Sequence, residues 1–388
     1  MAGLSLTSPL LAVLVGMIAV GVMLRTAPRF GGHNGRVVAI GLLIVAMASY
    51  ANAYFAYFPH VGDVVGPRPW PVGDSRDVNA AFSYVTPPAR AGGRGVVVSI
   101  PVPGRQSGTS AHSALVYLPP QYLEQPHTHF PVLYLLHGSP GVPLDWFRGG
   151  EAAVAGLAAA RAGVPVILVA PRMSAGWLDD SECMNGRTGR WETYLTSDVV
   201  PLIDARLRTQ PTASSRGIAG NSAGGYCALA VGLRHPGLFH HIVALSPLTK
   251  PTYSYGSLRD LFGRPADLPG TIREHTPLWL LQNREAARGV ELRLEVGQDD
   301  PVAADVRRFA ASARALGSGA LLVLRNGGHT FRFWRPALQE SVLWFGYSAQ
   351  ESTPGQLRLQ DPGNRGQTKK ASASRAANPT QERSRAVL

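Results

Sequence analysis

The stretch RGIAGNSAGGYCALAVGLRHP, residues 216–236, decides the fold. A short apolar run ends at Gly220, and an alanine-rich run with helical character begins directly after Ser222. Between them lies the pattern Gly-x-Ser-x-Gly, which places a serine on a sharp turn from strand to helix. Gly220 and Gly224 suit such a turn, because larger side chains would clash there. The stretch therefore predicts a nucleophile elbow with Ser222 as the nucleophile and a helix N-terminus aimed at the reacting centre.

A serine hydroxyl is a weak nucleophile until a base takes its proton, and the later sequence offers one. In folds with this elbow the partners follow in the order Asp or Glu, then His. The run LRLEV (292–296) precedes Asp299 and Asp300, and the run ALLVL (320–324) precedes His329. We expect His329 to be the base. Asp300 is favoured over Asp299 as the acid that orients it, because the proline after Asp300 opens the next helix.

The oxyanion of a tetrahedral intermediate needs two backbone donors. One is expected to be the NH of Ala223, the residue after the nucleophile. The other is expected from the loop after the apolar run 132–136, which reads HGSPG. Ser139 is the favoured donor and Gly138 the second candidate, since Pro140 has no NH.

Other residues around these motifs have simpler interpretations. We expect His137 to be packed and hydrogen-bonded, since His329 already holds the place of the base in chain order. Some tryptophans are candidates to line an acyl pocket, although packing is the commoner role for any one of them: Trp146, Trp177, Trp191 and Trp334. The acids at 179, 180 and 182 lack the spacing of a calcium-binding loop, so we expect a solvated loop. Neither a metal ion nor a cofactor is expected.

Between residues 94 and 348, short apolar runs alternate with amphipathic stretches. Strands alternating with helices predict a mostly parallel central sheet with helices on both faces, the α/β-hydrolase fold. The runs expected to be strands lie at 97–101, 114–118, 132–136, 166–170, 216–220, 241–245, 292–296 and 320–324.

Two uncharged apolar segments, at 4–24 and 37–58, precede this domain. At about 1.5 Å per residue each is long enough, as a helix, to cross a hydrocarbon core of about 30 Å. The loop between them carries Arg25, Arg29 and Arg36 and no acid, which favours a cytoplasmic loop. Residues 1–58 therefore predict a two-span hairpin in the plasma membrane, with everything after it extracytoplasmic. Tyrosines and phenylalanines at the end of the second segment fit an aromatic belt.

The flanks of the catalytic region differ from it in composition. Residues 59–93 are rich in proline and glycine and predict a linker, and residues 349–388 predict a basic disordered tail. The net charge is +12, but no basic stripe with interleaved aromatics appears, so a nucleic-acid partner is not expected. A membrane and anionic envelope polymers are the partners that such a tail suits.

The chain has two cysteines, Cys183 and Cys227. They form no metal-binding or redox pattern. We favour a small buried residue at Cys227 and an unpaired loop thiol at Cys183. A disulfide between them stays open, because a sequence does not supply the geometry that a bridge requires.

Five stretches together resemble the esterase D-like "putative esterase" family: PVLYLLHGSPG, WETYLTSDVVPLIDARLRT, the elbow stretch with its following strand, VGQDDP and GGHTFRFW. They run in family order from about residue 95 to 346. The family includes S-formylglutathione hydrolases, feruloyl esterases, enterochelin esterases and secreted mycolyltransferases. The resemblance implies an α/β-hydrolase fold whose Ser-Asp-His roles fall on Ser222, Asp300 and His329.

The chain also departs from these relatives. The run Ala223-Gly224-Gly225 is more typical of general esterases than of mycolyltransferases. S-formylglutathione hydrolases are soluble, whereas two membrane spans are predicted here. Neither substrate is therefore carried over by the resemblance.

The sequence thus predicts a membrane-anchored, extracytoplasmic serine esterase that acts on small-molecule or lipid carboxylic esters through an acyl-enzyme. The alternative is an acyltransferase that moves the same acyl group to a sugar or glycolipid hydroxyl. A third interpretation, an inactive hydrolase-fold binding module, is disfavoured because all three catalytic residue types are present at their expected places.

Overall fold

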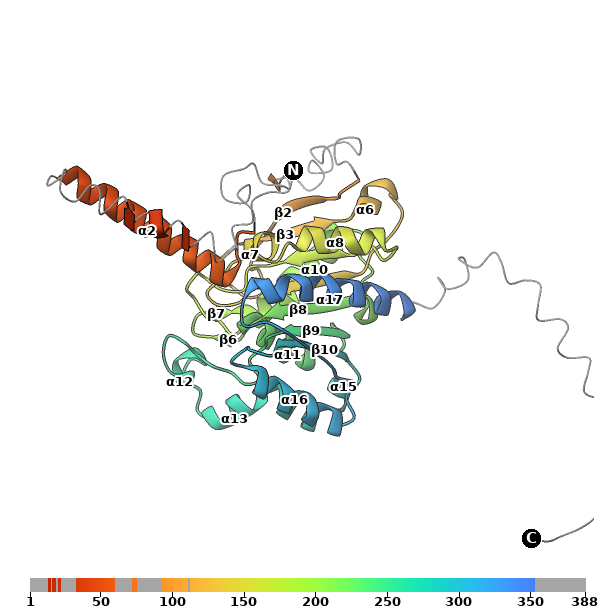
Figure 1. The fold of residues 1–388 in the computed structure, drawn as a ribbon. Coiled ribbons are helices and arrows are strands. Elements are labelled where there is room, and N and C mark those ends of the chain that lie inside the picture. The colour runs from red at the N-terminus through yellow and green to blue at the C-terminus, as the bar shows by residue number, and fades with distance from the viewer. Residues whose placement is uncertain are drawn as a thin grey trace, which may run out of the picture. The chain divides into compact units, whose positions relative to one another are not determined.

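A nine-stranded sheet forms the centre of the fold, in the order β1-β2-β3-β5-β4-β8-β9-β10-β11 (Figure 1). The structure is a computed structural model that describes residues 13–14, 16–18, 20–21, 33–59, 72–74, 93–110 and 112–352. The strands of the sheet are β1 (Val72–Asp74), β2 (Val96–Val102), β3 (His112–Leu118), β4 (Val132–Leu136), β5 (Ile167–Ala170), β8 (Arg216–Asn221), β9 (His241–Leu245), β10 (Glu291–Gly297) and β11 (Leu321–Arg325).

The sheet is mostly parallel. Only β3 runs against its neighbours β2 and β5, and the remaining adjacent pairs are parallel. The four central strands β5, β4, β8 and β9 are buried along their whole length, as expected for parallel strands covered on both faces. Each apolar run expected to be a strand lies on one, so the predicted α/β-hydrolase architecture is confirmed.

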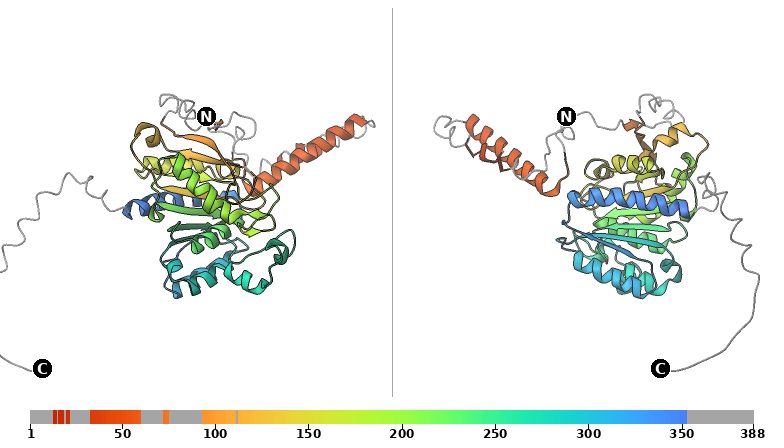
Figure 2. Two further views of the ribbon diagram at one scale, coloured as in Figure 1. Left: turned by 180° about the vertical axis from the view of Figure 1, so that it is seen from behind. Right: turned by 45° about the vertical axis from the view of Figure 1, so that its right-hand side comes forward.

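Helices cover both faces of the sheet (Figure 2). Leu133 of β4 packs in a core with α8 (Ala152–Arg161) and α17 (Phe331–Glu351). Its neighbour Tyr134 packs in the other core, with α10 (Val200–Arg206), α11 (Ala223–Arg234) and α16 (Ala303–Ala315). Successive strand residues face opposite sides, so one short apolar run serves two cores.

Shorter elements connect these layers. They are α6 (Pro120–Glu124), α7 (Leu144–Arg148), the hairpin strands β6 (Asn185–Gly186) and β7 (Gly189–Arg190), α9 (Trp191–Thr193), a π-helical turn (Tyr194–Val199), a 3-10 turn (Ala213–Ser215), α12 (Leu258–Leu261), α13 (Leu268–Glu274), α14 (Pro277–Asn283) and α15 (Glu285–Arg288).

A helix, α2 (His33–Phe55), covers most of the second predicted membrane span. Most of the first predicted span lies outside the described residues. Among the residues that are described, no helix combines the length and apolarity required for a membrane crossing.

At the end of the second predicted span, Tyr50, Tyr54 and Phe55 are exposed, whereas the chain next to them contacts the hydrolase fold. The helix stops at Phe55, and Asn52 exchanges hydrogen bonds with the backbone of Phe58 at 2.7 and 2.9 Å. Arg332 and Arg335 of α17 donate to the carbonyls of Ala53 and Ala56. These residues thus contact the hydrolase fold, a long-range packing that a local apolar pattern does not reveal.

The predicted linker at 59–93 and the predicted tail at 349–388 lie mostly outside the described residues. Within them, β1 pairs in parallel with β2, and α17 continues to Glu351, past the predicted domain end at residue 348.

Cys183 and Cys227 form a disulfide, with their Cα atoms 5.4 Å apart. The preference for two reduced cysteines was therefore wrong. The bridge ties the loop after β5 to α11, the helix that begins beside Ser222. The fold brings together two positions 44 residues apart, and a linear pattern carries no measure of that distance.

The acids of the loop after β5 are not all solvated, contrary to expectation. Asp180 is 3% exposed and Glu182 is 2% exposed. Thr252 donates a hydrogen bond to one carboxylate oxygen of Glu182 at 3.1 Å. Burial, together with the charge of Asp180, raises the pKa of Glu182 well above its usual 4.5. In the part of the chain that the structure describes, no group of acids, histidines and cysteines is arranged to hold a metal ion.

The raised pKa makes Glu182 a source of pH-dependent stability. The folded state holds the proton more tightly than the unfolded state, so this contribution is complete below pH 4.5 and is lost as the pH rises through the folded-state pKa. Glu182→Gln, which stays neutral, should gain unfolding free energy over the wild type, and the gain should be larger at pH 8 than at pH 5. Urea denaturation at both pH values measures it, with the exposed Glu124→Gln as control. Equal differences at the two pH values would contradict the assignment.

Candidate active site

Ser222 lies at the tip of a strained turn between β8 and α11. Its backbone has φ 54° and ψ −122°, a conformation that residues other than glycine seldom adopt. A Cβ atom on Gly220 would lie 2.0 Å from the carbonyl oxygen of Gly224, and one on Gly224 would lie 2.1 Å from that of Leu136. Both glycines of the motif are therefore required by close backbone approach, as the elbow prediction assumed.

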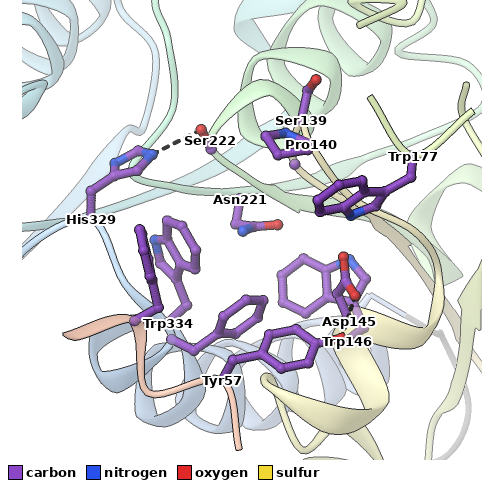
Figure 3. A pocket seen from close by; sticks show the side chains of 13 residues that line it. Tyr57, Ser139, Pro140, Asp145, Trp146, Trp177, Asn221, Ser222, His329 and Trp334 are labelled. Carbon is purple, nitrogen blue, oxygen red and sulfur yellow. Dashed lines mark hydrogen bonds between the residues drawn. The ribbon is translucent and has the colours of Figure 1, made fainter. Parts of the chain in front are cut away.

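Three side chains from three strand ends form one hydrogen-bonded chain. The Ser222 hydroxyl lies 2.8 Å from Nε2 of His329 (Figure 3), and Nδ1 of His329 lies 3.0 and 3.1 Å from the two carboxylate oxygens of Asp300. With Asp300 ionised, Nδ1–H donates to the carboxylate, and Nε2 is left to accept from the serine hydroxyl. The geometry is that of a nucleophile, a base and an acid that orients the base.

The structure also separates the two candidate acids. Asp299 is exposed, and its backbone NH donates to the carbonyl of Gly327. The side chain of Asp300 is buried and accepts from His329 and from the backbone NH of Val302. Burial alone would raise the pKa of Asp300, but these hydrogen bonds outweigh it and lower the pKa below its usual value. Asp300 is thus the acid in contact with the histidine.

Sequence reasoning missed Ser246, which follows directly after β9. This buried serine accepts a hydrogen bond from the indole NH of Trp334 at 3.0 Å and helps to lower the pKa of Asp300. The Trp334 ring packs edge to face against His329, with ring centres 4.9 Å apart. The sequence signal that could have identified Ser246 is its place directly after a predicted parallel strand. Asp300 and His329 also lie at the carboxyl ends of such strands.

A buried carboxylate links the strands that precede Asp300 and His329. Glu295 of β10 accepts from Arg293 at 2.7 Å, from Arg325 of β11 at 2.8 Å and from Ser341 of α17 at 2.8 Å. A buried charge with several donors is well satisfied, but it becomes costly if one partner is removed. These hydrogen bonds connect β10, β11 and α17 next to the site.

The residues predicted as the oxyanion hole surround Ser222. Leu136 of β4 pairs with Gly220 of β8, so the loop after β4 emerges beside the elbow. A Cβ atom on Gly138 would lie 3.5 Å from the Cβ of Ser222. Ala223 is the first residue of α11, and Ser139 lines the pocket that opens beside Ser222. The Ser139 hydroxyl points away from the pocket toward the carbonyl of Asp179 (Figure 3), which leaves only its backbone for the predicted role.

His137 supports this loop from below. It is buried; its Nδ1–H donates to the carbonyl of Gly138 at 2.9 Å, and its Nε2 accepts from the backbone NH of Met173 at 3.2 Å. Burial lowers its pKa, which favours the neutral ring that these two bonds require. His137 is packed and hydrogen-bonded, as expected.

A pocket of about 520 Å³ opens beside Ser222 and His329. Aromatic side chains form much of its wall: Phe55, Tyr57, Trp146, Trp177, Phe331 and Trp334. Three of the four tryptophans considered from the sequence thus line it. The fourth, Trp191, is buried elsewhere and packs against His112 and Tyr194. The site therefore places a hydrogen-bonded serine at the edge of a largely apolar cavity.

A protein family described as "Putative esterase" matches residues 109–345. The chain belongs to this esterase family. The matched residues include Ser222, Asp300 and His329, and the protein is an enzyme of the hydrolase or acyltransferase type.

Individual relatives agree with this membership. The esterase Rv1288 of Mycobacterium tuberculosis is 32% identical over 168 residues, which are 42% of this chain and 36% of that protein. An acetyl esterase of Caldicellulosiruptor saccharolyticus is 27% identical over 228 residues, which are 55% of this chain and 82% of that protein.

Solved structures share the fold. A ferulic acid esterase superposes with a TM-score of 0.57 at 23% identity, covering 66% of this chain and 98% of that one. An S-formylglutathione hydrolase from Agrobacterium tumefaciens superposes with a TM-score of 0.55 at 18% identity, covering 66% and 96%. The α/β-hydrolase fold is common to all three.

The contact between Asp300 and His329 predicts unequal effects for the two neighbouring acids. Asp300→Asn should lower kcat by about four orders of magnitude, the loss seen when a triad aspartate becomes asparagine and the histidine takes the wrong tautomer. Asp299→Asn, the matched control, should change kcat little. Hydrolysis of p-nitrophenyl acetate measures both, with circular dichroism to verify folding. A larger loss for Asp299→Asn would overturn the assignment.

Proposed function

We propose that this protein is a serine esterase that cleaves carboxylic esters through an acyl-enzyme on Ser222. The observation that carries the proposal is the continuous chain Asp300–His329–Ser222, with contacts of 2.8 to 3.1 Å, at the edge of an aromatic pocket. Membership of an esterase family supports the same reaction class.

The geometry supports an ordered sequence of steps. The Ser222 oxygen attacks the ester carbonyl carbon as its proton passes to Nε2 of His329, and Asp300 stabilises the imidazolium. Backbone amides of Ala223 and of Ser139 or Gly138 hold the oxyanion. His329 then returns the proton to the departing alkoxide, which leaves as the alcohol. Water, deprotonated by His329, attacks the acyl-enzyme and releases the acid and free Ser222.

Acyl transfer is the second candidate, because the largely aromatic pocket beside Ser222, about 520 Å³ in volume, has room for an acceptor molecule other than water. The acyl-enzyme would form in the same way, and a sugar or glycolipid hydroxyl would take the place of water. No new catalytic residue is required, since His329 would deprotonate either acceptor.

One experiment tests both candidates. The wild type should hydrolyse p-nitrophenyl acyl esters, and Ser222→Ala should lose activity by several orders of magnitude because it removes the nucleophile. Ser197→Ala, which changes an exposed serine, is the matched control and should keep wild-type activity. Adding trehalose or glucose and analysing the products by mass spectrometry separates the candidates: free acid alone supports hydrolysis, and acylated sugar supports transfer. A wild type without turnover would favour the binding-module interpretation.

We also propose that the N-terminal region holds the enzyme at the plasma membrane with the hydrolase domain outside. Helix α2 supports this, since it exposes apolar side chains including Val37, Ile40 and Ile44. The disulfide between Cys183 and Cys227 is a second support, because such bridges persist in oxidising compartments outside the cytosol.

The placement predicts a protease result. Protease added to intact cells should degrade the hydrolase domain, whereas a cytoplasmic marker protein should survive. The enzyme should also stay in the membrane fraction after a carbonate wash. Full protection of the hydrolase domain, or its release by carbonate, would contradict the placement.

A further inference from the structure

Part of the active-site pocket comes from outside the esterase domain. Phe55 and Tyr57 line the cavity together with Ser222 and His329, yet both precede residues 109–345, the part that matches the esterase family. Figure 3 shows Tyr57 across the cavity from Ser222, beside Trp146 and Asp145. The end of α2 and the turn after it therefore contribute to a site whose reacting groups follow strands of the hydrolase sheet.

The Tyr57 side chain is fixed by a polar contact at one end of its ring. Its hydroxyl donates to Oδ1 of Asp145 at 2.5 Å, and the other oxygen of Asp145 accepts from the backbone NH of Val142 at 2.8 Å. A hydrogen bond to a carboxylate is stronger than one between neutral groups. Because Asp145 lies in α7 directly before Trp146, this contact joins two walls of the pocket.

Aromatic packing connects the same tyrosine to the catalytic histidine. The Tyr57 ring packs edge to face on Phe331, with centres 5.3 Å apart. Phe331 packs on Trp334 at 5.1 Å, and Trp334 packs on His329 at 4.9 Å. Edge-to-face pairs at these separations are favourable beyond their buried area. The wall at Tyr57 is thus continuous with the groups that hold His329.

The backbone around Tyr57 is also fixed to the hydrolase fold. Ala56 is buried and has a φ of 53°, so the chain turns sharply after α2. Its carbonyl accepts from Arg335 at 2.8 Å, and Arg335 also donates to the carbonyl of Gly149 at 2.9 Å. One arginine of α17 therefore links this turn to the residue that follows α7.

We propose that Tyr57 is a specificity-determining residue: it bounds the aromatic pocket opposite Ser222 and limits the size of the apolar substrate group that the pocket accepts. The proposal rests on the esterase or acyltransferase function proposed above. A large side chain that ends a cavity excludes longer substrates by steric overlap, and its removal leaves room for additional methylene groups. The expected substrate is thus an ester with an apolar group, and Tyr57, which lies outside the residues that match the esterase family, limits the length of that group.

The test compares the selectivity of variants across two ester series. One series is p-nitrophenyl esters of acids from acetate to decanoate, and the other is acetates of alcohols of increasing size. Tyr57→Ala should raise kcat/KM for long relative to short members by about tenfold or more in at least one series, since each methylene buried in an apolar pocket contributes severalfold. Tyr57→Phe keeps the ring and should leave the ratio nearly unchanged.

The controls distinguish specificity from damage. Tyr347→Ala removes an exposed tyrosine of α17 that does not line the pocket, and its ratio should equal that of the wild type. A fluorophosphonate titration gives the concentration of reactive sites, so that rates refer to folded enzyme only.

Two failures have separate meanings. If the wild type turns over esters but Tyr57→Ala keeps the wild-type ratios in both series, the specificity proposal is overturned while the proposed function stands. If the wild type turns over no ester in either series, the proposed function itself fails.

Discussion

The hydrogen bond between the Ser222 hydroxyl and Nε2 of His329 is the interaction on which the remaining structure converges. The two residues lie 107 positions apart in the chain, and parallel strands ending at one edge of the sheet bring them together. The strained turn at Ser222 is possible because Gly220 and Gly224 carry no side chain. Asp300 and Ser246 follow the ends of β10 and β9, and the buried Glu295 network keeps β10, β11 and α17 aligned beneath them.

The pocket beside this contact combines residues of different origin. Its catalytic edge comes from the hydrolase sheet, and its far wall comes partly from the turn after α2. Aromatic rings connect the two, from Tyr57 through Phe331 and Trp334 to His329. This arrangement separates the machinery that cleaves an ester from residues that select it. Residues outside the part of the chain that matches the esterase family therefore contribute to the wall of its pocket.

Much of the fold and of the reacting centre could be predicted because the signals are local. Each apolar run expected to be a strand lies on one, and the spacing around Ser222 and before His329 located both residues. The choice between Asp299 and Asp300 was harder, since adjacent acids differ only in which side chain the fold buries. The disulfide, the buried Asp180 and Glu182, the position of Ser246 and the contacts of Tyr57 depend on distances between segments far apart in sequence. The two membrane spans were inferred from hydropathy alone, and the described part of the chain contains no helix that meets the requirement.

We expect contact with His329 to make the Ser222 hydroxyl reactive. The most direct measurement is the rate at which a fluorophosphonate modifies the protein, with the modified residue identified by peptide mass spectrometry. We expect modification of Ser222 in the wild type and a rate at least about a thousandfold lower in His329→Gln, because the proton then has no acceptor. Modification of another residue, or an equal rate in the variant, would contradict it.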